Sequence, residues 1–399
     1  MAIYAGVGLG QEEDAHAAGA EACRAALQEL SGAKANLLIV FSSVQYDQEQ
    51  MLDGVRSVES DALLVGCSTA GEITTQGPVP RHSVAVMALS SDSMHFFVGV
   101  GENIAASPRE AGRRAADALK AAAGEPLKAC MMFPDVLVGN GADIVRGVLD
   151  SLGPHFPLVG GAPGDDFLFK KTFQYVNDRV YSGAVVTLGI TGTFHTGIGV
   201  KHGWVPVGKP MIATKSEGSV LHEVDGKPAI NVYEDYFGKE RARELREKTL
   251  AQLAITYPLG MKVAGGDELL IRDPISVDQS GSITCAAEIP QGSEIRLMVG
   301  SREKAVEVAK EAAEDAVSQL EGASPKAVII FNCIARNKLF GDRSGEEIDA
   351  IQSAIGATVP LIGFYTYGEQ APLGGEVRNI EKCNPAFHNE TVVIFVIGE

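Results

Sequence analysis

Three short loops carry most of the side chains in this chain that could do chemistry. They read Gly66-Cys-Ser-Thr-Ala-Gly-Glu72, Gly160-Gly-Ala-Pro-Gly-Asp-Asp166 and Gly363-Phe-Tyr-Thr-Tyr-Gly-Glu-Gln370. Each follows an apolar run, so its small residues would bring backbone N–H groups close to whatever lies above the strand, which suits an anion. If the three loops converge, they predict a binding site for a small polar molecule.

The first loop offers a thiol, two hydroxyls and a carboxylate as candidate ligand groups, namely Cys67, Ser68, Thr69 and Glu72. The carboxylate could accept a hydrogen bond from an ammonium group. The plainer interpretation is that the glycines only make a turn and that Glu72 faces water. Because the loop is echoed three times along the chain, we favour the functional role.

The second loop carries paired carboxylates, Asp165 and Asp166. Such a pair could bind a cation or an amine, or one member could act as a general base. Adjacent aspartates in a loop are more often solvated, and no histidine lies nearby at the spacing of a metal site. We keep both aspartates as candidate ligand contacts and expect neither a metal nor a cofactor.

The third loop and the strand before it add a cation. Arg336, in Asn332-Cys-Ile-Ala-Arg336, has a planar guanidinium that can bind a carboxylate through two hydrogen bonds. Tyr365 and Tyr367 would share one face of an extended segment, and Glu369 follows them. With Asn332 this set would suit an amino-acid-like ligand. The alternative is an Arg–Glu ion pair that covers the core.

Two cysteines, Cys67 and Cys333, raise the alternative of a thiol- or carboxylate-dependent hydrolase or transferase. A nucleophilic cysteine needs a lowered pKa, usually from a base nearby. The candidate bases are His82, His202 and His222, which the sequence does not place in space. The other two loops carry different residues at the position of Cys67, so the repeat does not require a thiol and we expect no catalysis.

The elements that position the loops also repeat. Apolar runs precede the loops at 35–41, 128–133 and 326–331, and further runs close each copy at 83–89, 183–190 and 391–397. Alanine-rich helices are expected at about 12–30, 108–123 and 302–320. Self-similarity on this scale indicates one ancestral unit used three times, over about 1–94, 95–195 and 293–399. Ser107, Pro108 and Glu110 predict a capping box at the start of the second helix.

The segment between the second and third copies, about 196–292, differs in character. It carries two hairpin signals, one at Asp225-Gly226 and one pairing 274–278 with 282–286, and helices are expected near 228–237 and 239–254. We divide the chain into domains of residues 1–222 and 223–399. We expect an α/β fold with a two-part layered architecture, built from repeated strand–helix units around mixed β-sheets.

Composition excludes several classes of protein. The net charge of −17 opposes binding to nucleic acid and to an anionic membrane surface. No apolar run approaches the ~18 residues needed to span a bilayer, and we expect no signal peptide. The six cysteines are scattered without a Cys-x-x-Cys pair, which indicates a reduced, cytoplasmic protein.

Several phrases together resemble the FIST family, which combines an N-terminal and a C-terminal FIST domain. They are Val65-Gly-Cys-Ser-Thr-Ala-Gly-Glu-Ile73, Gly160-Gly-Ala-Pro-Gly-Asp-Asp-Phe167, Trp204-Val-Pro-Val-Gly208, Gly226-Lys-Pro-Ala229 with Tyr233, and the segments 332–336 and 363–370. Their order covers nearly the whole chain. The resemblance implies a small-molecule sensor, for amino acids or their derivatives, in a signalling system. Because the sequence shows no kinase, methyl-accepting or cyclase module, the signal would pass to a separate protein.

We therefore predict non-catalytic recognition of a small, polar, amino-acid-like molecule in a pocket where the three loops converge, with Arg336 as the anion anchor. The enzyme described above is one alternative. The other is an interaction scaffold, which would show an extended exposed apolar patch and no enclosed pocket.

Overall fold

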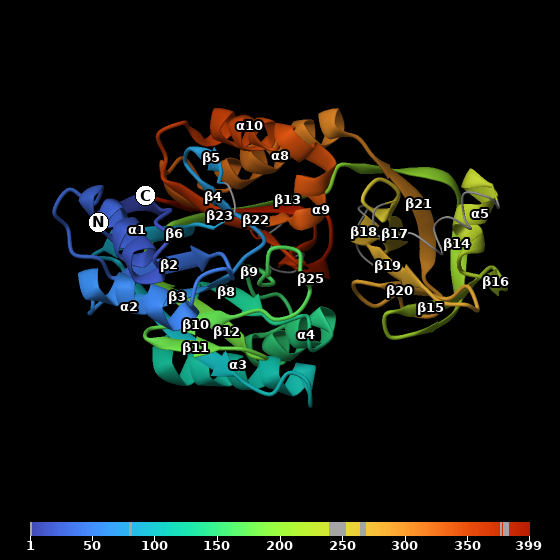
Figure 1. Cartoon of the computed structure of the whole chain (residues 1–399), viewed down its shortest axis with the longest axis horizontal. Coiled ribbons are helices and arrows are strands. Elements are labelled where there is room, and N and C mark those ends of the chain that lie inside the picture. The colour runs from blue at the N-terminus through green and yellow to red at the C-terminus, as the bar shows by residue number, and fades with distance from the viewer. Residues whose placement is uncertain (1, 80–81, 239–252, 264–268, 376, 378–382) are drawn as a thin grey trace.

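Three similar α/β units pack around a common centre, and a smaller, mainly β lobe projects from the third (Figure 1). The computed structural model describes residues 2–79, 82–238, 253–263, 269–375, 377 and 383–399. The predicted α/β architecture of repeated units around mixed sheets is confirmed. Within the described part of the chain, no helix has both the length and the apolar character needed to cross a bilayer.

The first unit begins at the N-terminus. Its elements are β1 (Ile3–Gly10), α1 (Ala15–Gln28), β2 (Leu37–Ser42), α2 (Gln48–Val58), β3 (Leu63–Ser68) and β6 (Val84–Ser91), with a small hairpin of β4 (Glu72–Thr74) and β5 (Gly77–Pro78). β2 runs parallel to β3, whereas β6 pairs antiparallel with both β1 and β2. The sheet is therefore mixed, as predicted.

The second unit repeats this order. Its elements are β7 (Met94–Gly101), α3 (Pro108–Ala123), β8 (Ala129–Pro134), α4 (Gly141–Leu152), β9 (Leu158–Gly161), the hairpin β10 (Gln174–Val176) and β11 (Arg179–Tyr181), and β12 (Val185–Gly192). Helix α3 has the predicted bounds, with Pro108 in its first turn. The predicted capping box is wrong, because Ser107 stands at the N-cap but its side chain makes no capping hydrogen bond.

The third unit completes the set. Its elements are β13 (His195–Lys201), α8 (Arg302–Ser318), β22 (Pro325–Cys333), α9 (Ile334–Phe340), η1 (Gly341–Arg343), α10 (Gly345–Ile355), β23 (Leu361–Thr366), the hairpin β24 (Glu369–Pro372) and β25 (Pro385–His388), η2 (Leu373–Gly375) and β26 (Val392–Gly398). β13 pairs antiparallel with β26 in the sheet of this unit.

The predicted start of the third copy near 293 is wrong, because its first strand is β13 and the lobe is inserted between that strand and α8. The glycine spacing of β13 carries the missed signal. A Cβ atom at Gly197 or Gly199 would lie 1.9 or 1.8 Å from a carbonyl oxygen of α8, and Gly99 and Gly101 approach α3 in the same way. Gly-x-Gly therefore marks a first strand that packs closely on its helix.

The small hairpin of each unit pairs with the sheet of a neighbouring unit. β4 pairs with β23 of the third unit, β10 with β3 of the first unit, and β24 with β9 of the second unit. This exchange is cyclic, so the three units close into one threefold body. Because each hairpin follows a glycine loop along the chain, the exchange also carries the three loops to the centre.

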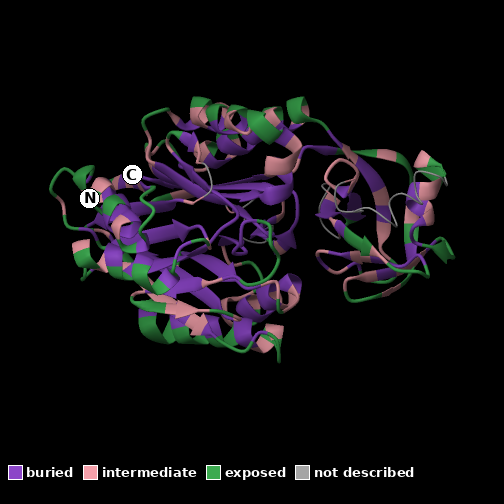
Figure 2. Ribbon diagram, viewed as in Figure 1, coloured by how far each residue is buried: buried purple, intermediate pink, exposed green. Residues whose placement is uncertain are grey.

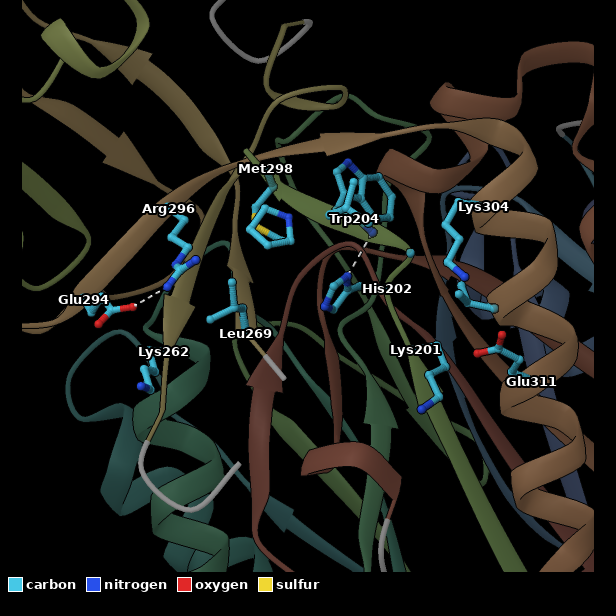
Figure 3. Close-up of a pocket in the computed structure, with 14 residues that line it drawn as sticks. Lys201, His202, Trp204, Lys262, Leu269, Glu294, Arg296, Met298, Lys304 and Glu311 are labelled. Atoms are coloured by element: carbon cyan, nitrogen blue, oxygen red, sulfur yellow. Dashed lines mark hydrogen bonds and ion pairs between the residues drawn. The ribbon is translucent and has the colours of Figure 1, made fainter. Parts of the chain in front are cut away.

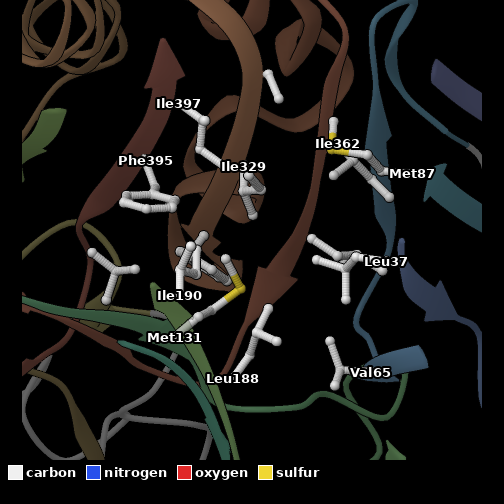
Figure 4. Close-up of a cluster of buried hydrophobic side chains, with 14 of the residues drawn as sticks. Leu37, Val65, Met87, Met131, Leu188, Ile190, Ile329, Ile362, Phe395 and Ile397 are labelled. Atoms are coloured by element: carbon white, nitrogen blue, oxygen red, sulfur yellow. The ribbon is translucent and has the colours of Figure 1, made fainter. Parts of the chain in front are cut away.

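The inner faces of the three sheets enclose one apolar core, and the helices cover the outer faces (Figures 2 and 4). Phe41, Phe133 and Phe331 come from the equivalent strands β2, β8 and β22. The Phe133 ring centroid lies 6.0 Å from that of Phe41 and 6.3 Å from that of Phe331. Phe364 packs against all three rings. The three apolar runs share a final phenylalanine because these rings meet at the centre of the body.

The lobe is built around one antiparallel sheet. Its elements are β14 (Trp204–Glu217), β15 (Val220–Val224), β16 (Lys227–Pro228), α5 (Asn231–Phe237), β17 (Leu259–Lys262), β18 (Leu269–Arg272), β19 (Pro274–Val277), β20 (Ile283–Cys285) and β21 (Glu294–Gly300). Both predicted hairpins are confirmed, as β15–β16 and β19–β20. The helix predicted near 228–237 begins at Asn231, and nearly all of the one predicted over 239–254 lies outside the described residues. The domain division at 222 falls within β15 and remains a prediction.

Candidate functional site

The three glycine loops meet at the centre of the threefold body, and we call this meeting point the loop centre (residues 66–72, 160–166 and 363–370). Backbone hydrogen bonds join every pair of loops. Their N–H donors are Ala70, Gly164 and Ala162, which bond to the carbonyl oxygens of Tyr365, Ser68 and Gly368 at 3.0, 3.0 and 2.7 Å. The convergence on which the predicted site depended is therefore real.

Glu72 neither faces water nor reaches an open pocket. Its carboxylate is fully buried and accepts hydrogen bonds from the Thr69 hydroxyl at 2.6 Å and from the Ser83 hydroxyl. Ser68 is also occupied, because its hydroxyl donates to the Gly164 carbonyl at 2.7 Å. These hydrogen bonds join the first loop to itself, to Ser83 and to the second loop, and leave Ser68 and Glu72 unavailable to a ligand.

Glu369 repeats this arrangement in the third loop. It is fully buried, and it accepts from the Thr366 hydroxyl and from the hydroxyl and N–H of Thr391, the latter two at 2.7 and 3.1 Å. Burial raises the pKa of both Glu72 and Glu369 to about 7, although the hydrogen bonds act in the opposite direction. Both carboxylates therefore titrate near neutral pH.

Asp165 organises the chain that follows the second loop. It accepts from three consecutive backbone N–H groups, those of Phe169, Lys170 and Lys171, at 2.8, 2.6 and 2.9 Å. The Tyr367 hydroxyl donates to the same carboxylate. The two predicted site residues are thus brought together, but they bond to each other.

Asp166 sits in the left-handed region, with φ of +55°. One of its oxygens accepts from the Ser43 hydroxyl at 2.9 Å and from the Gln45 amide at 3.0 Å. Among the described residues, its other oxygen has no hydrogen-bond partner. Asp166 is 5% exposed, so a solvated role is wrong for it.

Arg336 is fully buried, and the anion-anchor prediction is wrong. Its Nε donates to Glu347 of α10 at 2.8 Å, and its other donors reach Glu347 again and the carbonyl oxygens of Ala305 and His202. The Asn332 amide donates to the second Glu347 oxygen at 2.7 Å. The alternative, an Arg–Glu ion pair that covers the core, is what the structure contains.

The two cysteines of the enzyme alternative lie in buried strands. Burial raises the pKa of the Cys67 and Cys333 thiols well above its ordinary value, and the nearby carboxylates of Glu72 and Glu369 raise it further. A thiolate nucleophile is therefore not populated at neutral pH. Of the candidate bases, His202 has its pKa lowered to about 4, first by burial and then by Arg336. Among the described residues, no group of three or more His, Cys, Asp or Glu could hold a metal ion.

An open pocket of about 290 Å³ lies beside the loop centre, between the first and third loops and the 334–344 segment. We call it the Tyr365 pocket, and its lining residues are Ala70, Gly71, Pro78, Val79, Ile334, Asn337, Lys338, Gly341, Asp342, Ser344 and Tyr365. Tyr365 is only 2% exposed, and its buried hydroxyl has no hydrogen bond of regular geometry with any described residue. Asn337 and Ser344 approach it closely enough to affect its pKa.

The Tyr365 pocket also holds charges of both signs, Lys338 and Asp342. Such a pair can receive the carboxylate and the ammonium group of one small molecule. Sequence reasoning placed Tyr365 in the site but missed both charged residues. The available signal was two polar pairs that follow Arg336, Asn337-Lys338 in α9 and Asp342-Arg343 in η1.

Comparison with known proteins places these features in a family context. The sequence model of the FIST N domain matches residues 36–227, and that of the FIST C domain matches residues 229–372. An uncharacterized protein of Mycobacterium tuberculosis is 24% identical over 387 residues, covering 93% of this chain and 95% of the relative. An uncharacterized protein of Methanocaldococcus jannaschii is 24% identical over 326 residues, covering 77% of this chain and 61% of the relative.

Among solved structures, a cyanuric acid hydrolase from A. caulinodans aligns over 100% of both chains, with 8% identity and a TM-score of 0.37. A likeness this distant supports no statement about the fold or the activity of this chain.

Proposed function

The chain belongs to the FIST family, and from this premise we propose that it is a cytoplasmic sensory protein that binds a small amino-acid-like molecule in the Tyr365 pocket and signals to a separate protein. FIST domains are sensory domains of signalling proteins. The pocket, the ligand class and the partner are the parts that this proposal adds.

The observation that carries the proposal is the Tyr365 hydroxyl. Its contacts with Asn337 and Ser344 fall short of regular hydrogen-bond geometry, so a ligand atom that bonds to it would add a hydrogen bond worth about 0.5–1.5 kcal/mol. Lys338 and Asp342 lie in the same pocket and match a carboxylate and an ammonium group. The volume of about 290 Å³ is small and suits a metabolite rather than a peptide.

An exposed apolar loop beside the pocket offers a route to a partner. Phe167, Leu168 and Phe169 are 36%, 54% and 53% exposed. The Lys338 ammonium group lies 4.8 Å from the centroid of the Phe167 ring. A ligand carboxylate that draws Lys338 into the pocket would weaken this cation–π contact. The Phe167–Phe169 loop would then change its arrangement, and the partner would bind the two arrangements differently. Such a switch requires that the ligand binds the two loop arrangements with different affinity.

The test is a thermal-shift screen of the full chain against amino acids, small carboxylic acids and polyamines. A ligand at 100 times its dissociation constant stabilises the folded protein by roughly 2.7 kcal/mol, which is readily measured. We expect amino acids to shift wild type and Asp349→Asn, whose side chain lies on α10 outside the pocket, but not Asp342→Asn. Carboxylic acids acting equally on all three proteins would contradict the zwitterion site.

The scaffold alternative predicts a different result. It would use the exposed Phe167–Phe169 loop to bind a protein without any small ligand. No shift with any compound, together with partner binding that is lost in Leu168→Ser, would replace the sensor proposal by the scaffold.

A further inference from the structure

A second and larger cleft lies where the lobe joins the threefold body. The chain enters the lobe at Trp204 and leaves it at Gly300, and these two residues face each other in the β14–β21 pair. The cleft at this neck has a volume of about 500 Å³. We call it the neck cleft; its lining residues are Lys201, His202, Gly203, Trp204, Val205, Pro206, Lys262, Leu269, Glu294, Arg296, Met298, Lys304, Val308 and Glu311.

The lining of the neck cleft carries more cations than carboxylates, whereas the protein as a whole is acidic. The lining holds four Lys or Arg side chains and two Glu side chains, whereas the whole chain has 34 Lys and Arg against 51 Asp and Glu. Lys201 and Lys304 also have carboxylates near them outside the lining, Asp315 at 3.5 Å and Glu307 at 3.0 Å. Because such partly exposed ion pairs are worth little, a multivalent anion can compete for these cations.

The cations form two groups that face each other. Arg296, Lys262 and Glu294 come from the lobe, whereas Lys304 and Glu311 come from α8 of the body (Figure 3). His202 and Trp204 lie between the two groups in this view. The Trp204 ring is fixed, because its Nε1–H donates to the Ile255 carbonyl at 3.2 Å. The two groups, each of which contains one carboxylate, are therefore separated by a fixed part of the neck, where Trp204 is only 2% exposed.

The guanidinium of Arg296 has an N–H donor that is not used within the described part of the chain. Its Nη2 lies 3.2 Å from Glu294, but its buried Nε has no hydrogen-bond partner among the described residues. A guanidinium fork with an unused N–H is well suited to a phosphate oxygen.

We propose that the neck cleft binds a small polyhydroxy bisphosphate. One phosphate bonds to Arg296 and Lys262, and the other bonds to Lys201 and Lys304. Glu294 and Glu311 accept hydrogen bonds from hydroxyl groups between them, and the carbon skeleton spans the gap between the two groups. Because the two cationic groups belong to the lobe and to the body, the bound molecule holds the lobe in one position against the body.

Calorimetric titration of the full chain tests this site with three probes: fructose bisphosphate, a fructose monophosphate and inorganic phosphate. We expect the bisphosphate to bind at least about tenfold more tightly than the monophosphate, since each charged group adds charge-assisted hydrogen bonds. Arg296→Gln and Lys304→Gln should each weaken bisphosphate binding by about tenfold or more. Lys310→Gln is the matched control, because Lys310 lies on the same helix α8 but outside the cleft.

Three outcomes would overturn the proposal. The first is undetectable binding of all three probes. The second is equal affinity for bisphosphate and monophosphate, which would show that only one cationic group binds phosphate. The third is an equal loss in Lys310→Gln, which would indicate a general effect of charge. If Arg296→Gln does not fold, Lys304→Gln decides the test, since Lys304 is 39% exposed. Asp342→Asn should bind the bisphosphate normally, which separates this site from the Tyr365 pocket.

Discussion

The loop centre buries its charged side chains, whereas the neck cleft leaves its charged side chains partly exposed. At the loop centre, Glu72, Asp166 and Glu369 are buried and bonded by neighbouring side chains of the same chain. In the neck cleft, Arg296 and Lys304 keep a third or more of their side-chain surface exposed. The glycine loop occurs three times because each unit contributes one loop to the loop centre. The charged residues of the Tyr365 pocket, Lys338 and Asp342, and the lobe side of the neck cleft come from segments that occur once, and that is where we place ligand binding.

The largest expected effect concerns the buried ion pair. Arg336→Met leaves the Glu347 carboxylate buried and uncompensated, so we expect a loss of about 3–5 kcal/mol in the free energy of unfolding, measured by urea denaturation. Arg343→Met is the matched control, since its pair with Glu346 is exposed on both sides and should matter little. Equal losses in the two variants would mean that Arg336 is not the structural residue described here.

The next effect is a pH dependence that arises at the loop centre. The folded-state pKa of Glu72 and Glu369 is raised from 4.5 to about 7, so the folded protein binds more protons than the unfolded chain between these values. Each of these two groups should therefore lower the free energy of unfolding as pH rises from about 4.5 to about 7, by up to roughly 3 kcal/mol. Buried His202 and His388, whose pKa is lowered to about 4, act in the opposite direction, so the effect is measured as a difference between wild type and variants.

Glutamine variants locate this pH dependence. Glu72→Gln and Glu369→Gln should each remove the contribution of one carboxylate, because the amide mimics the protonated acid. Glu217→Gln, at an exposed position, should show the same pH profile as wild type. If the difference in unfolding free energy between wild type and both glutamine variants stays constant over this pH range, the two carboxylates are not held as described.

Two tyrosines give the smallest and most selective comparison. Tyr367→Phe removes the hydrogen bond to Asp165 and should cost about 1 kcal/mol in unfolding free energy. Tyr365→Phe removes a hydroxyl without a regular partner, so stability should change by less than about 0.5 kcal/mol while ligand binding weakens. A destabilised Tyr365→Phe protein would mean that this hydroxyl serves the fold and not a ligand.

Much of the fold could be predicted from the sequence, because local signals specify it. The bounds of α3, the two lobe hairpins and the repeated strands all follow from spacing and turn residues. The insertion after β13 was missed because Ile295–Gly300 has the same apolar character as a first strand. The exchange of hairpins between units was also missed, since it depends on contacts between distant strands that no local pattern reports.

The site was harder to predict than the fold. The convergence of the loops followed correctly from their repetition. The role of Arg336 did not, because its partner Glu347 lies on another helix and only the folded chain brings the two together. Repetition favoured the buried carboxylates as ligand groups, whereas Lys338 and Asp342, which line the open pocket, occur in a segment without any repeat.

The most direct test of the central claim is a crystal structure of the full chain with the amino acid that gives the largest thermal shift. We predict that the molecule lies in the Tyr365 pocket, with its ammonium group at Asp342 and a polar atom at the Tyr365 hydroxyl. The Thr69–Glu72 and Thr391–Glu369 hydrogen bonds should remain intact. A ligand that displaces these hydroxyls and binds to Glu72 or Glu369 would contradict the account, because the repeated loop centre would then be the binding site.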